Sequence, residues 1–317
     1  MEKSKLQHFP IAAFSSIMGL AGVSVALNKF YHLQWLPKWP FLAMMAIALL
    51  TFATVSYFYS RKAYIFYKDV NDDFKHRIRI NFFSAITISF LLLSIVFYGI
   101  WPLVALPFWW IGFLGHTYIM LHTIRFWIQH NFEIKTFNPA WFIPVVGNIL
   151  VPVIGVDFIA REIAWIYFGI GFLFWIILLT IFLNRVIFHD QMPKKFMPTF
   201  FILLAPPAIG FIAYVRITQS LDSFAFFMLY MAYFFAALLL MLHKSFRHLK
   251  FFVSWWAFLF PLASITIASV VAFQLTGMVI YQYLAWLFLA FALAAFVIVT
   301  SKTISAIKKG ELCVEED

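Results

Sequence analysis

Charge is scarce in this chain: Asp, Glu, Lys and Arg together make up 11% of its 317 residues, whereas hydrophobic residues make up 64%. There is a single cysteine, Cys313, which excludes an intrachain disulfide and a cysteine-based metal site. The sequence has no His-Glu-x-x-His motif, no glycine-rich nucleotide loop and no Cys/His cluster. These absences argue against an enzyme, a cofactor and a bound metal.

What the chain has instead is a series of apolar runs of about 20 residues, the length that a tilted helix needs to cross a bilayer. The sequence therefore predicts an all-α integral membrane protein with ten spans in one membrane domain. The expected helices are 9–28, 40–60, 80–99, 103–127, 139–156, 162–186, 196–215, 222–243, 251–274 and 278–301. Residues 302–317 are expected to form an acidic cytoplasmic tail.

The 23 Lys and Arg residues are distributed unequally between the two sides of these spans. Nineteen fall on the side of the two termini, and the four on the opposite side are Lys29, Lys38, Arg161 and Arg216. Cytoplasmic loops of membrane proteins are rich in Lys and Arg, so both termini are expected in the cytoplasm. The same distribution accounts for the net charge of +10 without a nucleic-acid partner.

Proline and glycine concentrate inside several odd-numbered spans. The fifth contains Pro144 and Pro152 and the seventh contains Pro206 and Pro207, whereas spans two, six, eight and ten have no internal proline. A proline within a spanning helix frees a backbone carbonyl, which is tolerated where neighbouring helices or water can satisfy it. We therefore expect five helical hairpins, with kinked odd-numbered helices inside and even-numbered helices facing lipid. The alternative is that these residues serve ordinary kinks and close packing.

Several segments, taken together, resemble a known family. Phe9-Pro10 with Met18–Leu20 is similar to the family's opening helix, Pro144–Asn148 to its fifth helix and Leu204–Pro206 to its seventh. The most specific match is Trp256–Ser264 in the ninth. Over nearly its whole length, the chain resembles the bacterial TehA-type proteins of the tellurite-resistance/dicarboxylate transporter family, which includes the plant slow anion channels.

The resemblance implies five hairpins around a pseudo-fivefold axis, a central pore lined by the odd-numbered helices, and a homotrimer with one pore per subunit. It also implies a bacterial inner membrane and a gate at Phe260, which would plug the pore midway. Two positions depart from the bacterial pattern: Ser15 stands where those relatives usually carry glycine, and Pro261 follows the gate as in the plant branch. The subfamily and the substrate therefore stay open.

The odd-numbered spans offer hydroxyls and small residues but almost no charge, which favours weak anion binding and fast release. The candidate pore-lining residues are Phe14, Ser15, Gly19, Ser84, Thr87, Asn148, Pro206, Pro261 and Ser264. For the hydroxyl groups among them, the alternative is hydrogen bonding within the helix.

Three further groups of ionisable residues need an interpretation. At the cytoplasmic end of the fourth span, His122 and Arg125 could attract anions; the alternative is an arginine that snorkels to the interface. We expect His116 in the same span to have a packing role or a hydrogen bond between subunits, rather than to relay protons. Asp157, near Arg161, is expected to form a structural ion pair.

The leading hypothesis is a gated channel for small monovalent anions such as chloride or nitrate, in which tellurite resistance would be a by-product of anion permeability. The alternative is a secondary carrier that exports sulfite or a C4-dicarboxylate, with or without proton coupling. Carriers usually need a charged or strongly polar group at mid-membrane, and the odd-numbered spans have none. The expected partners are small inorganic anions, the lipid bilayer and further copies of the chain.

Overall fold

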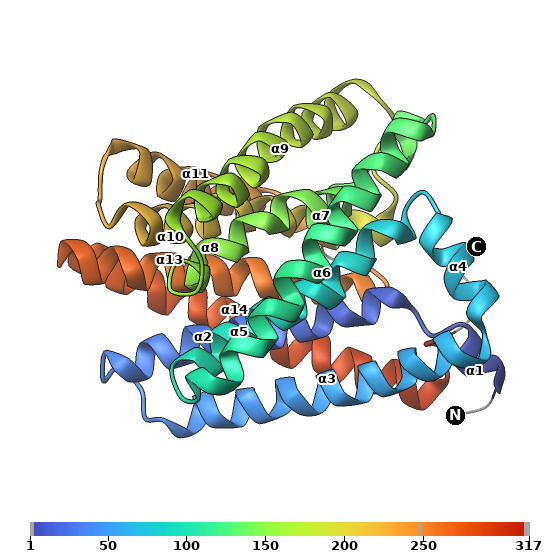
Figure 1. Ribbon diagram of the computed structural model, residues 1–317, viewed down its shortest axis with the longest axis horizontal. Helices are drawn as coiled ribbons and strands as arrows, with labels where there is room; N and C mark the ends of the chain where they lie inside the picture. Colours follow the sequence, from blue (N-terminus) through green and yellow to red (C-terminus); the bar gives the residue numbers. More distant parts are fainter. Residues whose placement is uncertain (1–2, 247–248, 314–317) are drawn as a thin grey trace.

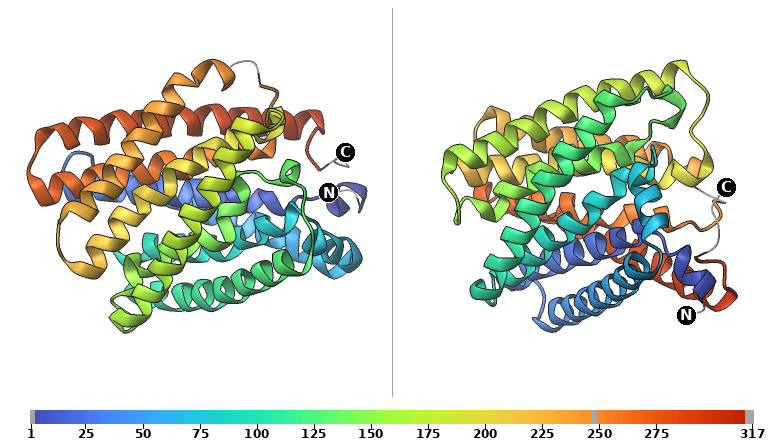
Figure 2. Two further views of the ribbon diagram at one scale, coloured as in Figure 1. Left: turned by 90° about the horizontal axis from the view of Figure 1, so that it is seen from above. Right: turned by 45° about the vertical axis from the view of Figure 1, so that its right-hand side comes forward.

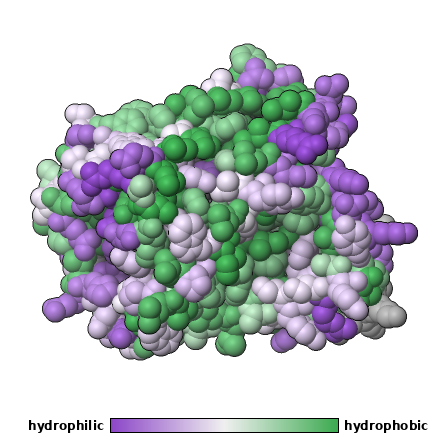
Figure 3. Space-filling view, viewed as in Figure 1, coloured by the Kyte–Doolittle hydropathy of each residue, from purple (hydrophilic) through white to green (hydrophobic). Residues whose placement is uncertain are grey.

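The computed structural model describes residues 3–246 and 249–313, and within these ranges the chain is helical without any β-strand (Figure 1). Nine helical stretches of this described part are long and apolar enough to cross a membrane, and a further stretch, Pro139–Gly155, is apolar but shorter. On the face that Figure 3 shows, hydrophobic side chains cover much of the middle, and hydrophilic ones gather toward the two ends. The prediction of an all-α integral membrane protein is confirmed.

Consecutive helices pack as five hairpins (Figure 2). The pairs are α2 (Phe14–His32) with α3 (Trp39–Ile65), α5 (Ser84–Tyr98) with α6 (Pro102–Gln129), the segment Pro139–Gly155 with α9 (Arg161–Phe188), α10 (Ala205–Thr218) with α11 (Ser223–Met241), and α13 (Leu259–Thr276) with α14 (Val279–Lys309). Three short α-helices of the described part lie outside these pairs, namely α1 (Lys3–Gln7), α4 (Tyr67–Lys75) and α12 (His243–Phe246), as does the 3₁₀ helix η3 (Ile134–Thr136).

The first member of each hairpin belongs to an inner ring. Helix α2 packs against α5 and α13, α10 packs against α13 and the segment Pro139–Gly155, and α5 contacts the other side of that segment, so the ring closes. In the four inner stretches long enough to span, 72–78% of the most apolar window is buried, against 28–39% in the outer helices. The inner helices are therefore covered by protein and the outer ones are left to face lipid, as the distribution of proline and glycine predicts.

Close packing within the ring depends on small residues. A Cβ atom at Gly19 of α2 would lie 2.6 Å from the Cβ of Leu259 on α13, so only glycine fits at this contact. Small residues allow backbones to approach closely where no hydrophobic force drives helices together in lipid. Gly19 thus fixes the distance between the first and last inner helices.

Every inner segment begins with a 3₁₀ helix before any α-helical turn. These are η1 (Ile11–Ala13), η2 (Arg79–Phe83), η4 (Pro139–Trp141), η6 (Lys194–Leu204) and η7 (Val253–Phe258). The inner segments also run in the same direction, with their N-terminal ends toward α1 and α4 (Figure 1). All five N-terminal ends therefore meet at one end of the molecule.

The third inner segment is interrupted more than the sequence suggests. In place of one helix over 139–156, the chain forms η4, α7 (Phe142–Val146), η5 (Gly147–Leu150) and α8 (Val151–Gly155). Pro144 and Pro152 lack the N–H that a helix interior needs, and each lies in the first turn of a short helix, where that bond is not required. The 3₁₀ stretch η5 separates the two helices, and the whole segment is shorter than the other spans.

The bounds of other helices also differ from expectation. The expected helix 196–215 is a 3₁₀ helix up to Leu204 and continues as an α-helix to Thr218. The last helix reaches Lys309, so part of the expected tail 302–317 is helical. The final four residues of that tail, 314–317, lie outside the described residues, as do residues 247 and 248 of the basic loop before α13.

Candidate functional site

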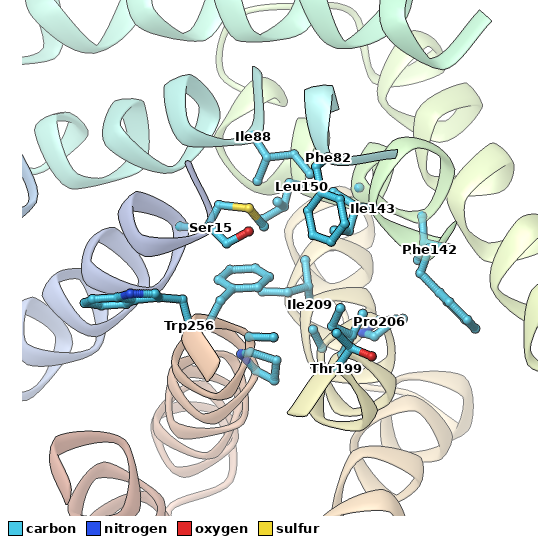
Figure 4. A pocket seen from close by; sticks show the side chains of 18 of the residues that line it. Ser15, Phe82, Ile88, Phe142, Ile143, Leu150, Thr199, Pro206, Ile209 and Trp256 are labelled. Carbon is cyan, nitrogen blue, oxygen red and sulfur yellow. The ribbon is translucent and has the colours of Figure 1, made fainter. Parts of the chain in front are cut away.

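A central cavity of about 80 Å³ lies inside the ring, and all five inner segments contribute to its wall. Ser15 of α2, Ile88 of α5 and Ile209 of α10 point toward this space from three sides (Figure 4). Leu150 of the segment Pro139–Gly155 and Phe260 of α13 also line the cavity. A space of this size has room for a few water-sized particles.

The described wall of the central cavity carries no charged side chain and very few polar ones. Its hydroxyl groups are those of Ser15, Thr199 and Ser254, and the other lining residues are apolar apart from Gly147. Two of these three hydroxyls bond to backbone: Thr199 to the carbonyl of Phe196, and Ser254 to that of Lys195. An ion in this space would meet mainly hydrocarbon.

Phe260 stands at the start of α13, where the 3₁₀ turn changes into an α-helix, and Pro261 follows it. Its ring is partly exposed to the cavity. A Cβ at Gly22 of α2 would lie 3.1 Å from Cδ2 of Phe260, so this glycine makes room for the ring. The hydroxyl of Ser264 donates a hydrogen bond of 2.8 Å to the carbonyl of Phe260. The ring is thus held between two inner helices.

Four of the predicted pore residues lie in the wall of the central cavity: Ser15, Pro206, Phe260 and Pro261. The other predicted pore residues pack between helices. Phe14 is buried with its ring edge-on to Tyr59 at 5.7 Å, and Gly19 lies against Leu259.

The remaining predicted polar residues are buried in the helix packing, and among the described residues all of them except the Ser84 hydroxyl have a hydrogen-bond partner. Ser84 is fully buried, and the hydroxyl of Thr87 donates to its carbonyl at 2.9 Å. Asn148 donates through Nδ2 to the carbonyl of Val145 at 2.7 Å, and Ser264 bonds to its own helix. Except at Ser15, the predicted hydroxyls therefore serve the backbone or helix packing rather than the cavity.

His116 is fully buried between the second and third hairpins of this chain. Its Nδ1 lies 2.9 Å from Oγ1 of Thr87, and a Cβ at Gly147 would lie 3.0 Å from its Cε1. Gly147 is the residue at which the third inner segment changes from α7 to η5. The imidazole thus fills the space that this break creates.

His122 and Arg125 lie apart from the cavity. The ring of His122 stacks on Phe74 of α4 with 4.5 Å between centroids, and Arg125 is exposed. At the opposite end of the molecule, Asp157 forms an ion pair with Arg216 of α10 rather than with Arg161.

A second and more polar cavity of about 540 Å³ opens at the N-terminal ends of the inner segments. It shares four lining residues with the central cavity, namely Ala12, Phe82, Val253 and Ser254, so the two spaces adjoin. We call this second cavity the vestibule. Unlike the central cavity, it is lined by both acidic and basic side chains.

An ion-pair cluster forms part of the vestibule wall. Nζ of Lys62 lies 2.9 Å from Oδ2 of Asp73, and Arg79 pairs with the other carboxylate oxygen. Lys62 also donates to the carbonyl of Phe9 at 3.0 Å. Lys62 and Asp73 are each only 3% exposed, and buried charges of this kind require partners. We call Lys62, Asp73 and Arg79 the vestibule triad.

Sequence reasoning missed the vestibule triad, because it treated the basic residues of 61–79 only as markers of orientation. The signal was present in three acidic residues among those bases, Asp69, Asp72 and Asp73. A loop that merely follows the positive-inside rule needs no such acids.

Comparison with known proteins places the chain among membrane transport proteins. Residues 8–304 match the family model SLAC1, described as "Voltage-dependent anion channel". The S-type anion channel SLAH3 of Arabidopsis thaliana is 26% identical over 84% of this chain and 43% of the plant protein. The uncharacterized transporter MJ0762 of Methanocaldococcus jannaschii is 25% identical over 98% of both chains.

A bacterial relative gives the same assignment: the tellurite resistance protein TehA homolog of Haemophilus influenzae is 26% identical over 67% of this chain and 65% of that protein. The chain spans about half the length of the plant relatives SLAH3 and SLAH2, 43% and 53% respectively. The family match covers nearly all of the inner ring and its outer helices. The chain therefore belongs to the SLAC1 family of voltage-dependent anion channels.

Proposed function

We propose that this protein conducts small monovalent anions through its central cavity and that Phe260 closes the path. The observation that carries the proposal is the position of Phe260 in the wall of a cavity bordered by all five inner segments. Relatives named as anion channels support the class of substrate.

The electrostatics of the backbone favour an anion. The five inner segments run in the same direction (Figure 1), and all but the third contribute residues near their N-terminal ends to the vestibule wall. A helix carries about half a positive charge at its N-terminus, so five parallel helices attract anions toward this end. The apolar wall beyond adds no fixed cation that would hold an anion tightly.

A phenylalanine ring is suited to closing such a path. A narrow space lined with hydrocarbon resists wetting, and an ion that has lost its water gains little from the wall. Gly22 gives the ring a defined place, and a small movement of the ring would change the free cross-section. Selectivity in the open state would then follow the cost of removing water from the anion.

The proposal extends to the orientation of the protein in the membrane and to its oligomeric state. We propose that both termini face the cytoplasm of a bacterial inner membrane, with the vestibule as the cytoplasmic opening. Nineteen of the 23 Lys and Arg residues fall on that side, which is the usual bias of cytoplasmic loops. We further propose a homotrimer in which each subunit has its own path.

Recordings from purified wild-type protein and Phe260→Ala in planar bilayers, under chloride, nitrate, sulfite and malate gradients, test the proposal. We expect a nearly silent wild type and a conducting variant that prefers chloride and nitrate. Silence of both, together with proton-dependent sulfite or malate uptake into liposomes, would establish a carrier instead. Ordinary channel currents in the wild type that the substitution leaves unchanged would refute the gate.

A further inference from the structure

Among the described residues that line the vestibule, basic and acidic side chains are equal in number. Its basic lining residues are Lys62, Arg79 and Lys195, its acidic ones are Asp69, Asp72 and Asp73, and His8 and His76 add two imidazoles. With neutral histidines these lining charges cancel. An anion that approaches would therefore meet no net attraction from the side chains.

The acidic side chains of the vestibule differ in burial and therefore in their effect on the local potential. Asp73 is buried and its two carboxylate oxygens bind different cations, Lys62 on one side and Arg79 on the other. Asp72, only one residue away, is exposed to water. A buried charge is screened far less than an exposed one, so Asp73 has the larger effect on the local potential.

The two cations differ in how firmly they are held. The Lys62 side chain is 4% exposed and also bonds to the carbonyl of Phe9, whereas that of Arg79 is 43% exposed and reaches the open space of the vestibule. Without Asp73, Lys62 would retain its bond to the carbonyl of Phe9, and Arg79 would lose its carboxylate partner. The shared carboxylate therefore determines how much positive charge the vestibule presents.

We propose that Asp73 masks an anion site made by Lys62 and Arg79 and thereby sets how strongly the vestibule attracts anions. A conducting path needs attraction strong enough for an ion to enter and weak enough for it to leave. Two unmasked cations in a partly buried position would hold a small anion, and one shared carboxylate weakens that hold. The inference deepens the proposed function and rests on it only where anion flux is concerned.

The chain supplies its own probe of the vestibule potential. Cys313 is the single cysteine, and it follows the last helix, close enough to Lys62 and Lys5 to be influenced by their charges. Burial raises the pKa of its thiol, while these two cations act in the opposite direction. The ratio of its modification rates by an anionic and a cationic methanethiosulfonate reports the local potential, because the thiol pKa affects both rates equally.

The test measures this ratio in Asp73→Asn, in the matched control Asp72→Asn and in Arg79→Gln. We expect Asp73→Asn to raise the anionic-to-cationic ratio by roughly fivefold at low salt, from one uncancelled charge near the thiol. The effect should fade at high ionic strength. The control should change it by less than about twofold, since its carboxylate is screened by water. Arg79→Gln should lower the ratio.

Two outcomes would overturn the inference: an unchanged ratio in Asp73→Asn, or equal changes in Asp73→Asn and Asp72→Asn. If Asp73→Asn does not fold, Arg79→Gln decides alone, because Arg79 is partly exposed and an unchanged or raised ratio would contradict the mask. Chloride current is then measured in the Phe260→Ala background. A changed ratio in a protein that never conducts would refute the proposed function and leave the mask standing.

Discussion

The central cavity and the vestibule adjoin, yet they are built on opposite principles. The cavity is small, and its described wall has no charge and includes the aromatic ring of Phe260. The vestibule is larger and is lined by balanced charges, with a buried carboxylate between two cations. Under the proposed function, the difference assigns admission and closure to separate regions. Charge in the vestibule would govern how an anion arrives, and apolar packing around the central cavity would govern whether it passes.

The largest effect on anion current is expected from replacing the side chain of Phe260. Substituting Phe260 by leucine, valine and alanine should raise chloride current in that order, reaching roughly tenfold or more in Phe260→Ala as the apolar constriction widens. Bilayer recordings at matched protein amounts measure this. The matched control is Phe258→Ala, two residues earlier, whose ring packs against Phe201 at 4.7 Å outside the cavity wall. Equal currents in both variants would show that the ring merely packs.

The vestibule triad should matter more for stability than for closure. Lys62→Ala leaves Asp73 with only Arg79 and removes the bond to Phe9, so we expect a loss of about 3 kcal/mol, typical of a broken buried pair. Arg79→Ala, whose side chain is 43% exposed, should cost about 1 kcal/mol or less. Thermal unfolding in detergent compares the two. A larger loss in the arginine variant would contradict the order of burial.

Gly22, which makes room for the Phe260 ring, offers a further test of the proposed gate. Gly22→Ala would place a Cβ 3.1 Å from Cδ2 of Phe260 and 3.2 Å from Cβ of Ala263, so the ring has to shift. We expect a stability loss of about 1–3 kcal/mol and a current above that of the wild type but below that of Phe260→Ala. The control is Gly169→Ala in α9, where no atom lies within 4 Å. Identical currents in Gly22→Ala and the wild type would count against the gate.

The smallest effect on stability is expected from substituting Asp222, which lies far from both cavities. Its carboxylate caps α11 by accepting from Phe224 and Ala225, and the hydrogen bond from Tyr214, followed by that from Ala225, lowers its pKa. A lowered pKa stabilises the folded state above the ordinary value of 3.8, and this stabilisation is lost as pH falls through the folded-state pKa. Asp222→Ala should slightly lower the melting temperature at pH 7, and the difference from the wild type should shrink as pH falls through the folded-state pKa of Asp222.

The same variant checks the comparison of the two cavities. Asp222 lies on the loop between α10 and α11, at the C-terminal end of an inner helix and away from the vestibule (Figure 1). Its substitution should leave anion current unchanged in the Phe260→Ala background. A change in current would mean that loops at that end also belong to the path.

The sequence predicted much of the fold because bilayer physics acts locally. A run of apolar residues must form a helix in lipid, since its backbone groups have no other partner. Proline also indicated the inner helices, because the backbone carbonyl that it frees needs a partner in neighbouring protein or water. Glycine did so because it allows close helix packing. Pro144 and Pro152 were visible in the sequence, but the number of breaks that they produce depends on packing against His116 and α9.

The site was less predictable. Ser15, Pro206, Phe260 and Pro261 were expected in the pore and do line the cavity, whereas Phe14, Gly19, Thr87 and Asn148 face neighbouring helices. Along an inner helix nearly all residues are buried, so hydropathy shows no side that faces a pore. Rotation about the helix axis is decided by neighbours, which a single sequence does not display.

By itself, then, the sequence determined that this chain crosses a membrane as helical hairpins and which helices lie inside, because hydropathy, charge bias and proline act over short stretches. The tertiary structure alone decided which side chains meet. Lys62, Asp73 and Arg79 come from three elements and share one carboxylate only after α3, α4 and η2 have packed together. Such contacts depend on distances between segments, and these are fixed by the packing of the whole ring.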